Sequence, residues 1–328
     1  MDKKIGIIGS GGWGIALSII FNKLKYKIYL WEPLKENYEI LIKKRENINY
    51  FKGVKIPKEV GISNSLEEVV ENSKILIIVV RSSFFRKTIE DLKNIYKDQY
   101  VIIGTKGLEY QTSKRMSEIL TEYIKTENFA ILSGPTIAKE IVKGYPTAAV
   151  IASKNLSVAE SLQKIISCEN FRIYTSTDII GAEIGGSFKN IVAIGAGIID
   201  GLKLGINTKS SYITRGLNEM IKIGTFLGGE EKTFRGLSGI GDLITTSFSK
   251  YSRNRSFGEG IVKIGKEKYL KKAKMVIEGI PTTKAFYELS RKFKIELPIT
   301  EAIYRIIYEN SDVKEEIKKL MIRELKRE

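Results

Sequence analysis

The sequence predicts an α/β fold with a doubly wound parallel sheet, followed by a second, all-helical domain. Short apolar segments such as residues 4–8 and 74–80 alternate with helical segments, which is the pattern of βαβ units. A glycine-rich turn directly follows the first of these segments. Near Thr177 the pattern changes, and only helical periodicity continues beyond it. We therefore expect a sheet domain over residues 1–180 and a helical domain over residues 181–328.

The glycine-rich turn reads Gly9-Ser10-Gly11-Gly12-Trp13-Gly14, with the spacing G-x-G-x-x-G. In this pattern Gly9 makes the tight turn, Gly11 lets the backbone approach a pyrophosphate, and Gly14 lets helix and strand pack closely. The diphosphate is expected on the N–H groups of the following helix. Glu32 ends the second predicted strand, 18 positions after Gly14, near the spacing of ~20 for the acid that holds an adenosine ribose. The first domain is thus predicted to be a Rossmann-type dinucleotide-binding domain, with a glycine turn of another α/β protein as the alternative.

Polar residues follow the later predicted strands. These strands are residues 27–31, 74–80, 100–104, 129–132, 147–152 and 171–174. The segments at their ends include Ser82-Ser83, Thr105-Lys106-Gly107 and Ser133-Gly134-Pro135-Thr136. Ligands of open α/β sheets bind outside the carboxyl ends of the strands, so these segments are expected to line one crevice. Lys106 is the only charged residue among them and is a candidate ligand for an anion, although it also suits a surface position.

Composition limits the chemistry. The 54 Lys and Arg residues exceed the 38 Asp and Glu residues, which gives a net charge of +16. Because the basic residues are scattered among acidic ones, we expect compositional bias with mild steering of an anionic substrate and no nucleic-acid partner. With no histidine and Cys168 as the single cysteine, histidine-based catalysis, a structural zinc site and an internal disulfide are all excluded. No integral membrane segment, no metal and a cytoplasmic location are expected.

Lys189 is the first candidate in the helical domain. It is the only charged residue between Glu183 and Asp200, in a stretch rich in Gly, Ala and Ile. Lysine is almost never buried in such surroundings without a purpose or a partner. We expect desolvation and a second cation such as Lys106 to ease its deprotonation, so that it serves acid–base chemistry. A lysine that extends from a helix edge into solvent is the alternative.

Two further segments gather polar groups. Gly239-Ile240-Gly241-Asp242 places a carboxylate in a turn of small residues, where it also suits a helix N-cap. Ser252-Arg253-Asn254-Arg255 combines hydroxyl, guanidinium and amide donors, a set suited to a phosphate monoester, with an unremarkable basic loop as the alternative. The helices expected in this domain are residues 187–199, 212–227, 261–270, 282–293, 299–308 and 313–325.

Taken together, these segments resemble the bacterial NAD(P)-dependent glycerol-3-phosphate dehydrogenases. The matching motifs run along nearly the whole chain. They are residues 9–14, Gly104-Thr105-Lys106-Gly107-Leu108-Glu109, Ser133-Gly134-Pro135-Thr136-Ile137-Ala138-Lys139-Glu140, Lys189-Asn190, Gly241-Asp242-Leu243, residues 252–255 and Val276-Ile277-Glu278-Gly279. Several long motifs in the family order are far more specific than a single glycine turn.

The resemblance implies reduction of dihydroxyacetone phosphate to sn-glycerol 3-phosphate, which supplies phospholipid synthesis. It implies that Lys189 is the proton donor and acceptor. The substrate-binding residues would be Lys106, Gly134, Thr136, Asn190, Asp242, Ser252, Arg253 and Asn254. The cofactor-binding residues would be Gly9, Gly11, Gly12, Trp13, Gly14, Glu32, Lys106, Ala138, Arg253, Val276 and Glu278. A homodimer is expected.

The chain departs from the family pattern at two places. Arg81-Ser82-Ser83 stands where the family usually has Pro-Ser-His, and Pro33 stands where Arg or His is common. Glu32 without a neighbouring Arg favours NAD over NADP, because its carboxylate would face the 2′-phosphate. Two other interpretations remain. One is another two-domain dehydrogenase, for a hydroxy acid or sugar, which would not explain the phosphate donors at residues 252–255. The other is a non-catalytic dinucleotide-sensing or nucleic-acid-binding module, which would not explain Lys189.

Overall fold

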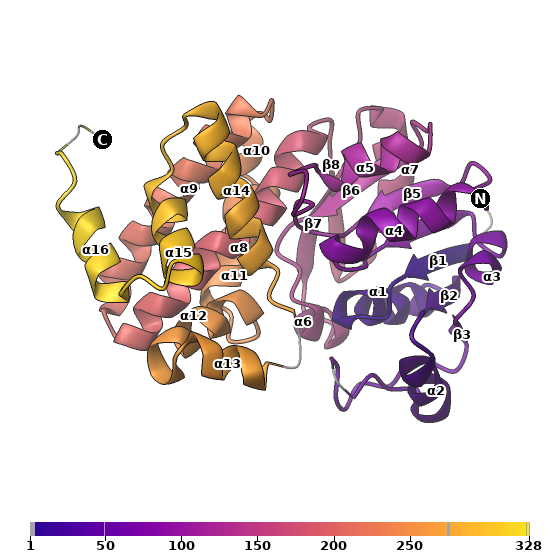
Figure 1. Ribbon diagram of the computed structural model, residues 1–328. Coiled ribbons are helices and arrows are strands. Elements are labelled where there is room, and N and C mark those ends of the chain that lie inside the picture. Colours follow the sequence, from indigo (N-terminus) through magenta and orange to yellow (C-terminus); the bar gives the residue numbers. More distant parts are fainter. Residues whose placement is uncertain (1–3, 49, 274–275, 326, 328) are drawn as a thin grey trace. The chain divides into compact units, whose positions relative to one another are not determined.

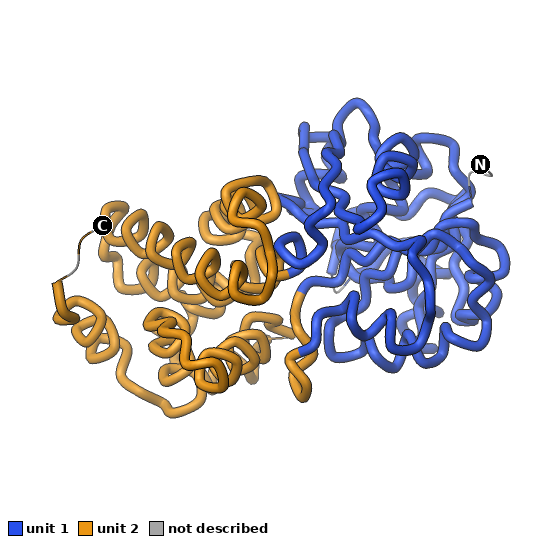
Figure 2. The backbone as a smooth tube through the Cα atoms, turned by 90° about the horizontal axis from the view of Figure 1, so that it is seen from above, with its two compact units in different colours: residues 1–106, 114–183 blue, residues 107–113, 184–328 orange. Residues whose placement is uncertain are grey.

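The chain folds into two compact units, each with its own colour in Figure 2. The computed structural model describes residues 4–48, 50–273, 276–325 and 327. The sheet unit runs to Lys106 and resumes over Lys114–Glu183, and the helical unit takes Gly107–Ser113 and the chain from Ile184 onward. The chain therefore passes between the units three times, after residues 106, 113 and 183. The 107–113 segment belongs with the helices, which its position in the sequence does not suggest.

The sheet unit contains one eight-stranded sheet of order β3-β2-β1-β4-β5-β6-β7-β8. Its strands are β1 (Lys4–Ile8), β2 (Lys27–Trp31), β3 (Gly61–Ser63), β4 (Ile75–Ile78), β5 (Tyr100–Ile103), β6 (Phe129–Ser133), β7 (Thr147–Ala152) and β8 (Phe171–Ser176). Neighbouring strands are parallel except β6 and β7, which are antiparallel. The predicted doubly wound parallel sheet is thus confirmed, with this one pair as an exception. The short connection through α6 (Ala138–Val142) returns the chain to the adjacent strand in the opposite direction. Strand β3 was not expected, because it has only three residues.

Helices cover both faces of this sheet, as Figure 1 shows for α1 and α4. The helices of the unit are α1 (Gly12–Lys23), α2 (Lys35–Lys44), α3 (Leu66–Glu71), α4 (Ser82–Lys93), α5 (Met116–Tyr123), α6 and α7 (Leu156–Ile166). Ile5 and Ile7 of β1 pack in one apolar cluster with the buried residues of α1, α6 and α7, and Ile8 packs in another with those of α4 and α5. Because successive strand residues face opposite sides, a strand covered on both faces must be apolar throughout.

The helical unit is built from the rest of the chain. Its helices are α8 (Ile179–Leu202, from Ile184), α9 (Gly205–Phe226), α10 (Glu231–Phe234), the π-helical turn η1 (Leu237–Gly241), α11 (Asp242–Phe248), α12 (Arg253–Ile264), α13 (Lys266–Lys272), α14 (Gly279–Phe293), α15 (Pro298–Tyr308) and α16 (Val313–Met321). The single helix expected over residues 261–270 is wrong. Gly265, at φ +85°, separates α12 from α13, a conformation that glycine adopts without steric cost. The 252–255 segment is not a basic loop, because α12 begins at Arg253 with Ser252 as its N-cap.

Helix α8 is the only helix of the described chain that is long and apolar enough to cross a membrane. Its sequence mostly lacks charges because 94% of its most apolar 18-residue window is buried inside the protein. A helix that is apolar all round is expected at the centre of a helical core as well as in a bilayer. The burial accounts for the composition of α8. The helix also carries the predicted site residues Lys189 and Asn190.

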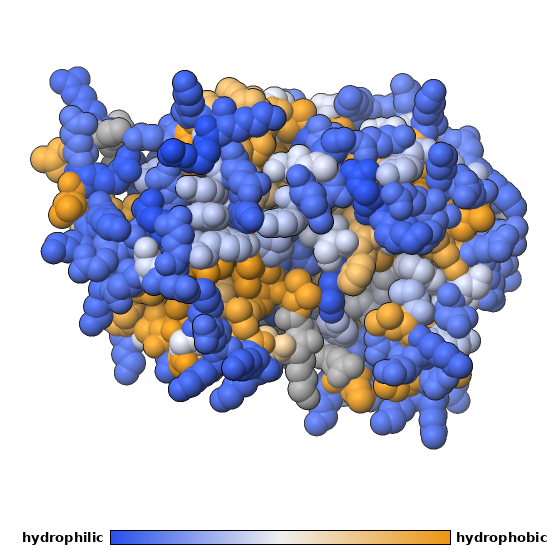
Figure 3. Space-filling view, in the orientation of Figure 1, coloured by the Kyte–Doolittle hydropathy of each residue, from blue (hydrophilic) through white to orange (hydrophobic). Residues whose placement is uncertain are grey.

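The surface visible in Figure 3 is mostly hydrophilic, in keeping with the high content of charged residues. Apolar residues gather on this face of the helical unit around α11 and α12. The large apolar side chains that α11 and α12 expose include Ile244, Phe248 and Ile264. Hydrophilic residues therefore cover most of this face, and the apolar ones are gathered in a limited part of it.

Candidate active site

The glycine-rich turn has the geometry that its sequence predicts. Gly9 has φ +120°, a value that favours glycine, and directly follows β1. A Cβ at Gly14 would lie 1.9 Å from the carbonyl oxygen of Gly9, so helix and turn can approach this closely only with glycine there. Gly11, the N-cap of α1, has open space around the position of a Cβ. The first turn of α1, which lies in the described part of the chain, has no acidic residue and no side-chain cap, so its N–H groups can donate to an anion.

Glu32 lies against this turn. Its buried carboxylate accepts a hydrogen bond from the hydroxyl of Ser10, a residue of the turn, and its Oε1 accepts one from the N–H of Leu34 at 2.9 Å. The register of β1 with β2 places Ile8 opposite Trp31, so the ends of the two strands are adjacent. The carboxylate is thus held beside the expected dinucleotide site, where remaining lone pairs can accept hydrogen bonds from ribose hydroxyls.

The loop that follows α2, which was not predicted to belong to the site, packs over the same turn. The side-chain amide of Asn47 donates to the carbonyl oxygen of Ser10 at 3.1 Å. The ring of Phe51 lies so close to Gly12 that a Cβ there would be 3.1 Å from it. The Arg81 guanidinium hydrogen-bonds to the hydroxyl of Tyr50. The one sequence signal for this contact is the glycine at position 12, which leaves room for a neighbour. The sequence does not indicate which distant side chain fills that room.

Lys106 and Thr136 converge on Gly134 within the sheet unit. The Lys106 Nζ donates to the carbonyl oxygen of Gly134 at 3.0 Å, and the Thr136 hydroxyl donates to the same oxygen at 3.2 Å. Two of the segments expected at strand ends are therefore in contact. Ala138 begins α6 a few residues later and packs against the apolar cluster that contains α1. The predicted ligands after β5 and β6 thus gather at one end of the sheet.

In the helical unit, Lys189 pairs with Asp242. The Lys189 Nζ lies 2.5 Å from Asp242 Oδ1, and the two residues are only 7% and 1% exposed. Thr246 also donates to this oxygen, at 3.3 Å. The charged partner that the structure shows for Lys189 is therefore a carboxylate, which the sequence did not suggest. A carboxylate neighbour stabilises the ammonium form, which is the form that donates a proton.

The π-helical turn η1 explains the position of Asp242. Asp242 is the first residue of α11 and follows this turn directly, so it does not lie in a simple turn of small residues. Single π-turns are rare and occur often at functional sites, because the extra residue redirects the side chains that follow. Here the redirected side chain is the carboxylate that meets Lys189 of α8.

Asn190 and Asn254 form a second polar connection beside the ion pair. The Asn254 Nδ2 donates to Asn190 Oδ1 at 2.8 Å, and the Asn254 Oδ1 accepts the N–H of Gly279 at 2.9 Å. Both asparagines are buried. These two hydrogen bonds link α8, the first turn of α12 and the start of α14. Predicted residues that are more than sixty positions apart in sequence are brought into contact.

The first turn of α12 carries the remaining predicted ligands. Ser252 caps the helix by accepting the N–H of Arg255 at 3.2 Å. Arg253 is exposed, and its Nη1 donates to the carbonyl oxygen of Val276 at 3.0 Å. Glu278 follows as the N-cap of α14. The contact joins two residues predicted to touch the cofactor.

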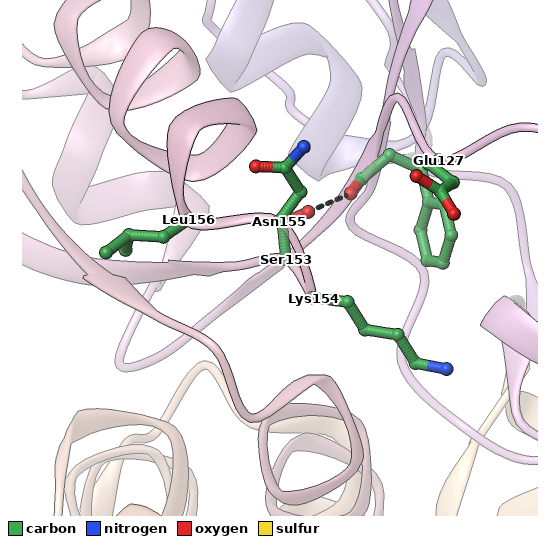
Figure 4. A pocket seen from close by; sticks show the side chains of 6 residues that line it. Glu127, Ser153, Lys154, Asn155 and Leu156 are labelled. Carbon is green, nitrogen blue, oxygen red and sulfur yellow. Dashed lines mark hydrogen bonds between the residues drawn. The ribbon is translucent and has the colours of Figure 1, made fainter.

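One surface cavity of about 440 Å³ is lined by none of these residues (Figure 4). It is lined by Glu127, Phe129, Ser153, Lys154, Asn155 and Leu156 in the sheet unit. The Ser153 hydroxyl there donates to the carbonyl oxygen of Phe129 at 2.7 Å. Its polar groups serve the strand ends and the cap of α7, so this cavity is not assigned to the dinucleotide or the substrate. Within the described ranges, no group of three or more Cys, Asp or Glu residues could hold a metal ion.

A Rossmann-type unit with a bare helix N-terminus at its glycine turn, followed by a helical unit with a buried lysine–carboxylate pair, defines a two-domain nicotinamide-dependent dehydrogenase. Family models match both parts. Residues 4–159 match the NAD-dependent glycerol-3-phosphate dehydrogenase N-terminus, and residues 178–318 match the C-terminus of that family. The chain belongs to the NAD-dependent glycerol-3-phosphate dehydrogenase family.

Individual relatives agree with the family models. The chain is 44% identical over 330 residues to the glycerol-3-phosphate dehydrogenase [NAD(P)+] of Thermoanaerobacter sp., covering 99% of this chain and 98% of that protein. It is 41% identical to the enzyme of the same name from Fusobacterium nucleatum, with the same coverage. The crystal structure of glycerol-3-phosphate dehydrogenase from Coxiella burnetii superposes with a TM-score of 0.94 at 33% identity, covering 98% of this chain and all of that one. The similarity thus extends over the whole length.

Proposed function

We propose that this protein reduces dihydroxyacetone phosphate to sn-glycerol 3-phosphate with NAD(P)H, and that its product supplies glycerophospholipid synthesis. The observation that carries the proposal is the Lys189–Asp242 ion pair, buried on the central helix of the helical unit. Its relatives bear the name of this activity. A buried ammonium held by a carboxylate suits a reaction that must deliver one proton to a developing alkoxide.

The proposed site residues have different roles in the reaction. When bound, the dinucleotide supplies the hydride that reaches the C2 carbonyl carbon of the substrate. Lys189 donates a proton to the C2 oxygen, and Asp242 orients the ammonium and stabilises its charge. Asn190, fixed by its bond with Asn254, hydrogen-bonds to the same substrate region. Arg253 and Lys106 carry the positive charge that holds the substrate's phosphate and carbonyl oxygen, without taking part in bond changes.

The sheet unit fits a dinucleotide at three points. The bare N-terminus of α1 receives the pyrophosphate, and Glu32 accepts hydrogen bonds from the adenosine ribose. Trp13 of the same turn packs edge-on against Phe171, with ring centroids 6.4 Å apart, and this contact holds one side of the glycine turn in place. Because a fixed carboxylate would repel a 2′-phosphate, we propose that NADH is preferred over NADPH.

The reaction is tested by following NADH oxidation at 340 nm with purified protein. Oxidation is expected with dihydroxyacetone phosphate and is expected to be far weaker with unphosphorylated dihydroxyacetone, because the phosphate contributes the binding energy that positions C2. Equal kcat/KM for the two compounds would contradict the role given to Arg253. No oxidation with either compound would contradict the reaction.

The cellular form of the protein follows as a further part of this proposal. We place it in the cytoplasm as a homodimer that needs no nucleic acid. Exposed apolar side chains on the helical unit, including Ile206 at 62% and Phe226 at 53% exposure, support the dimer, because association would remove them from water. Light scattering of the purified protein is expected to give twice the mass of one 37.0 kDa chain. A monomer at micromolar concentration would contradict it.

A further inference from the structure

A second charged cluster lies in the helical unit and has no role in the mechanism above. Asp200 accepts two hydrogen bonds from the Lys209 ammonium, at 3.0 and 2.8 Å, and one from Arg255 Nε at 2.6 Å. The Lys209 side chain is 7% exposed, the Arg255 side chain 17% and that of Asp200 22%. One carboxylate therefore holds two cations that are largely withdrawn from solvent. Such an arrangement fixes geometry, because either cation would be left poorly solvated without it.

The cluster connects the helices that carry the proposed catalytic residues. Asp200 lies on α8 with Lys189, and Arg255 lies on α12 with Arg253. Lys209 comes from α9, which carries no residue of the proposed site. Its ammonium also lies 4.4 Å from the ring centroid of Phe248, the last residue of α11. Helix α9 thus braces α8, α11 and α12 from outside the site.

The backbones of α8 and α12 touch next to this cluster. A Cβ at Gly258 would lie 1.8 Å from the carbonyl oxygen of Ile194, and a Cβ at Gly197 would lie 1.9 Å from that of Arg255. Because the two helices meet backbone to backbone, side chains cannot adjust the distance between them. These contacts turn the Gly258 face of α12 toward α8, and what remains to be set is the finer rotation of its first turn about the helix axis.

Three consecutive residues set that rotation. In an α-helix, neighbouring side chains point about 100° apart, so residues 253, 254 and 255 cover the whole circumference of the first turn. Arg255 points to Asp200, Asn254 to Asn190, and Arg253 to the carbonyl oxygen of Val276. The contact of Arg255 is an ion pair, and its carboxylate partner also binds the Lys209 ammonium. The two arginines of the 252–255 segment therefore have different partners and different tasks.

We infer that Asp200, together with Lys209 and Arg255, is a positioning group that aims the first turn of α12, so that Arg253 and Asn254 bind the substrate's phosphate. The inference rests on the proposed function. Arg255 is not a phosphate ligand, because its guanidinium is committed to Asp200 and, at 3.3 Å, to Glu259. Specificity for a phosphorylated substrate thus depends on a carboxylate that never touches it.

The test compares phosphate selectivity in matched variants of the full chain. The readout is kcat/KM for dihydroxyacetone phosphate divided by that for unphosphorylated dihydroxyacetone. In Asp200→Asn and Arg255→Met this ratio is expected to fall by about tenfold to a hundredfold, mainly through KM for the phosphorylated substrate. The Kd for NADH, followed by tryptophan fluorescence, is expected to stay within twofold. Arg255→Lys keeps a cation for Asp200 and is expected to retain an intermediate ratio.

Lys263→Gln is the matched control, because it removes an exposed ion pair with Glu259 from the same helix. Its ratio is expected to equal that of the parent protein. If Asp200→Asn lowers the activity toward both substrates by the same factor, the cluster is only structural and the inference is wrong. If the parent protein oxidises no NADH with dihydroxyacetone phosphate and binds no sn-glycerol 3-phosphate by calorimetry, the proposed function fails first and the inference falls with it.

Discussion

Lys189 and Asp242 are separated by 53 positions in the chain, and their side-chain charges meet at 2.5 Å in a nearly closed part of the helical unit. Neither residue is stable there alone. Removing one partner of a buried ion pair leaves an uncompensated charge and costs about 3–5 kcal/mol, whereas replacing both can be neutral. This asymmetry makes it possible to separate the contribution of the pair to stability from its contribution to catalysis.

Lys189→Met is expected to lower kcat by ~10²–10⁴, because it removes the proton donor. NADH binding is expected to persist, since the glycine turn and Glu32 lie in the sheet unit. Initial rates and fluorescence titration measure the two quantities. A methionine variant with half of the parent activity would reduce Lys189 to a packing residue.

The double variant Lys189→Met/Asp242→Leu is expected to be more stable than Lys189→Met alone, because the buried carboxylate leaves together with the buried ammonium. Its activity is expected to stay as low as that of the single variant. Urea unfolding measures the free energy of each protein. If stability does not recover in the double variant, the pair is not electrostatically coupled as the geometry indicates.

Arg253→Ala is expected to raise KM for dihydroxyacetone phosphate by more than about tenfold, because a charge-assisted contact to a phosphate is lost. Its effect on unphosphorylated dihydroxyacetone is expected to be small. Arg235→Ala is a suitable control, since Arg235 is an exposed arginine of the same unit that pairs only locally with Glu231. Similar losses in both variants would indicate a general effect of net charge.

For the cofactor, kcat/KM is expected to favour NADH over NADPH by at least roughly tenfold, equivalent to ~1.4 kcal/mol. Glu32 is held at the turn by Ser10, so it cannot easily move away from a 2′-phosphate. Glu32→Ala with Pro33→Arg is expected to erase or reverse the preference. Equal use of both cofactors by the parent protein would show that the carboxylate does not reach the ribose.

Glu219 is expected to make stability fall with rising pH. Burial raises the pKa of Glu219 to about 7, although the N–H groups of Ile299 and Thr300 oppose this by donating to its carboxylate. Because the folded protein keeps a proton that the unfolded chain releases, stability declines as pH rises from the ordinary value of about 4.5 through 7, by at most about 3 kcal/mol.

Glu219→Gln does not ionise, so the difference in unfolding free energy between variant and parent is expected to grow in favour of the variant over this range and to level off above it. Urea unfolding at several pH values between 4 and 8 measures this difference. A difference that is independent of pH would mean that the pKa of Glu219 is not raised in the folded protein.

Much of the sheet unit could be predicted because its information is local. An all-apolar strand, a glycine turn and an acid at the end of the next strand form one local sequence pattern, which predicts that the acid lies beside the turn. Glu32 lies there, in contact with Ser10. The antiparallel β7 could not be predicted, since strand direction depends on how a short connection packs and not on the periodicity of the strand. The same holds for Phe51 against Gly12, a contact between segments whose local sequences carry no sign of each other.

In the helical unit, composition identified Lys189 but not its partner. The lack of other charges nearby indicated burial, whereas the pairing with Asp242 depends on the π-helical turn, which has no simple sequence signature. Asp200 and Lys209 were not predicted as site residues, and Arg255 was grouped with the phosphate donors of residues 252–255, for a similar reason. Their ion pairs arise from the crossing of three helices, which pattern reading does not resolve.

The assignment of residues 107–113 to the helical unit affects how the protein can be dissected. Gly107 donates its N–H to the Ser187 hydroxyl at 3.0 Å, and Tyr110 receives the ammonium of Lys284. A fragment cut out from Ile184 onward would lose both contacts, and a fragment ending at Glu183 would carry a loop folded for absent helices. Neither unit can therefore be excised as one continuous segment of the chain. Gene fusions, split reporters or domain exchanges among relatives would have to move two separate pieces of chain together, so recombination within this protein is constrained at three junctions and not at one.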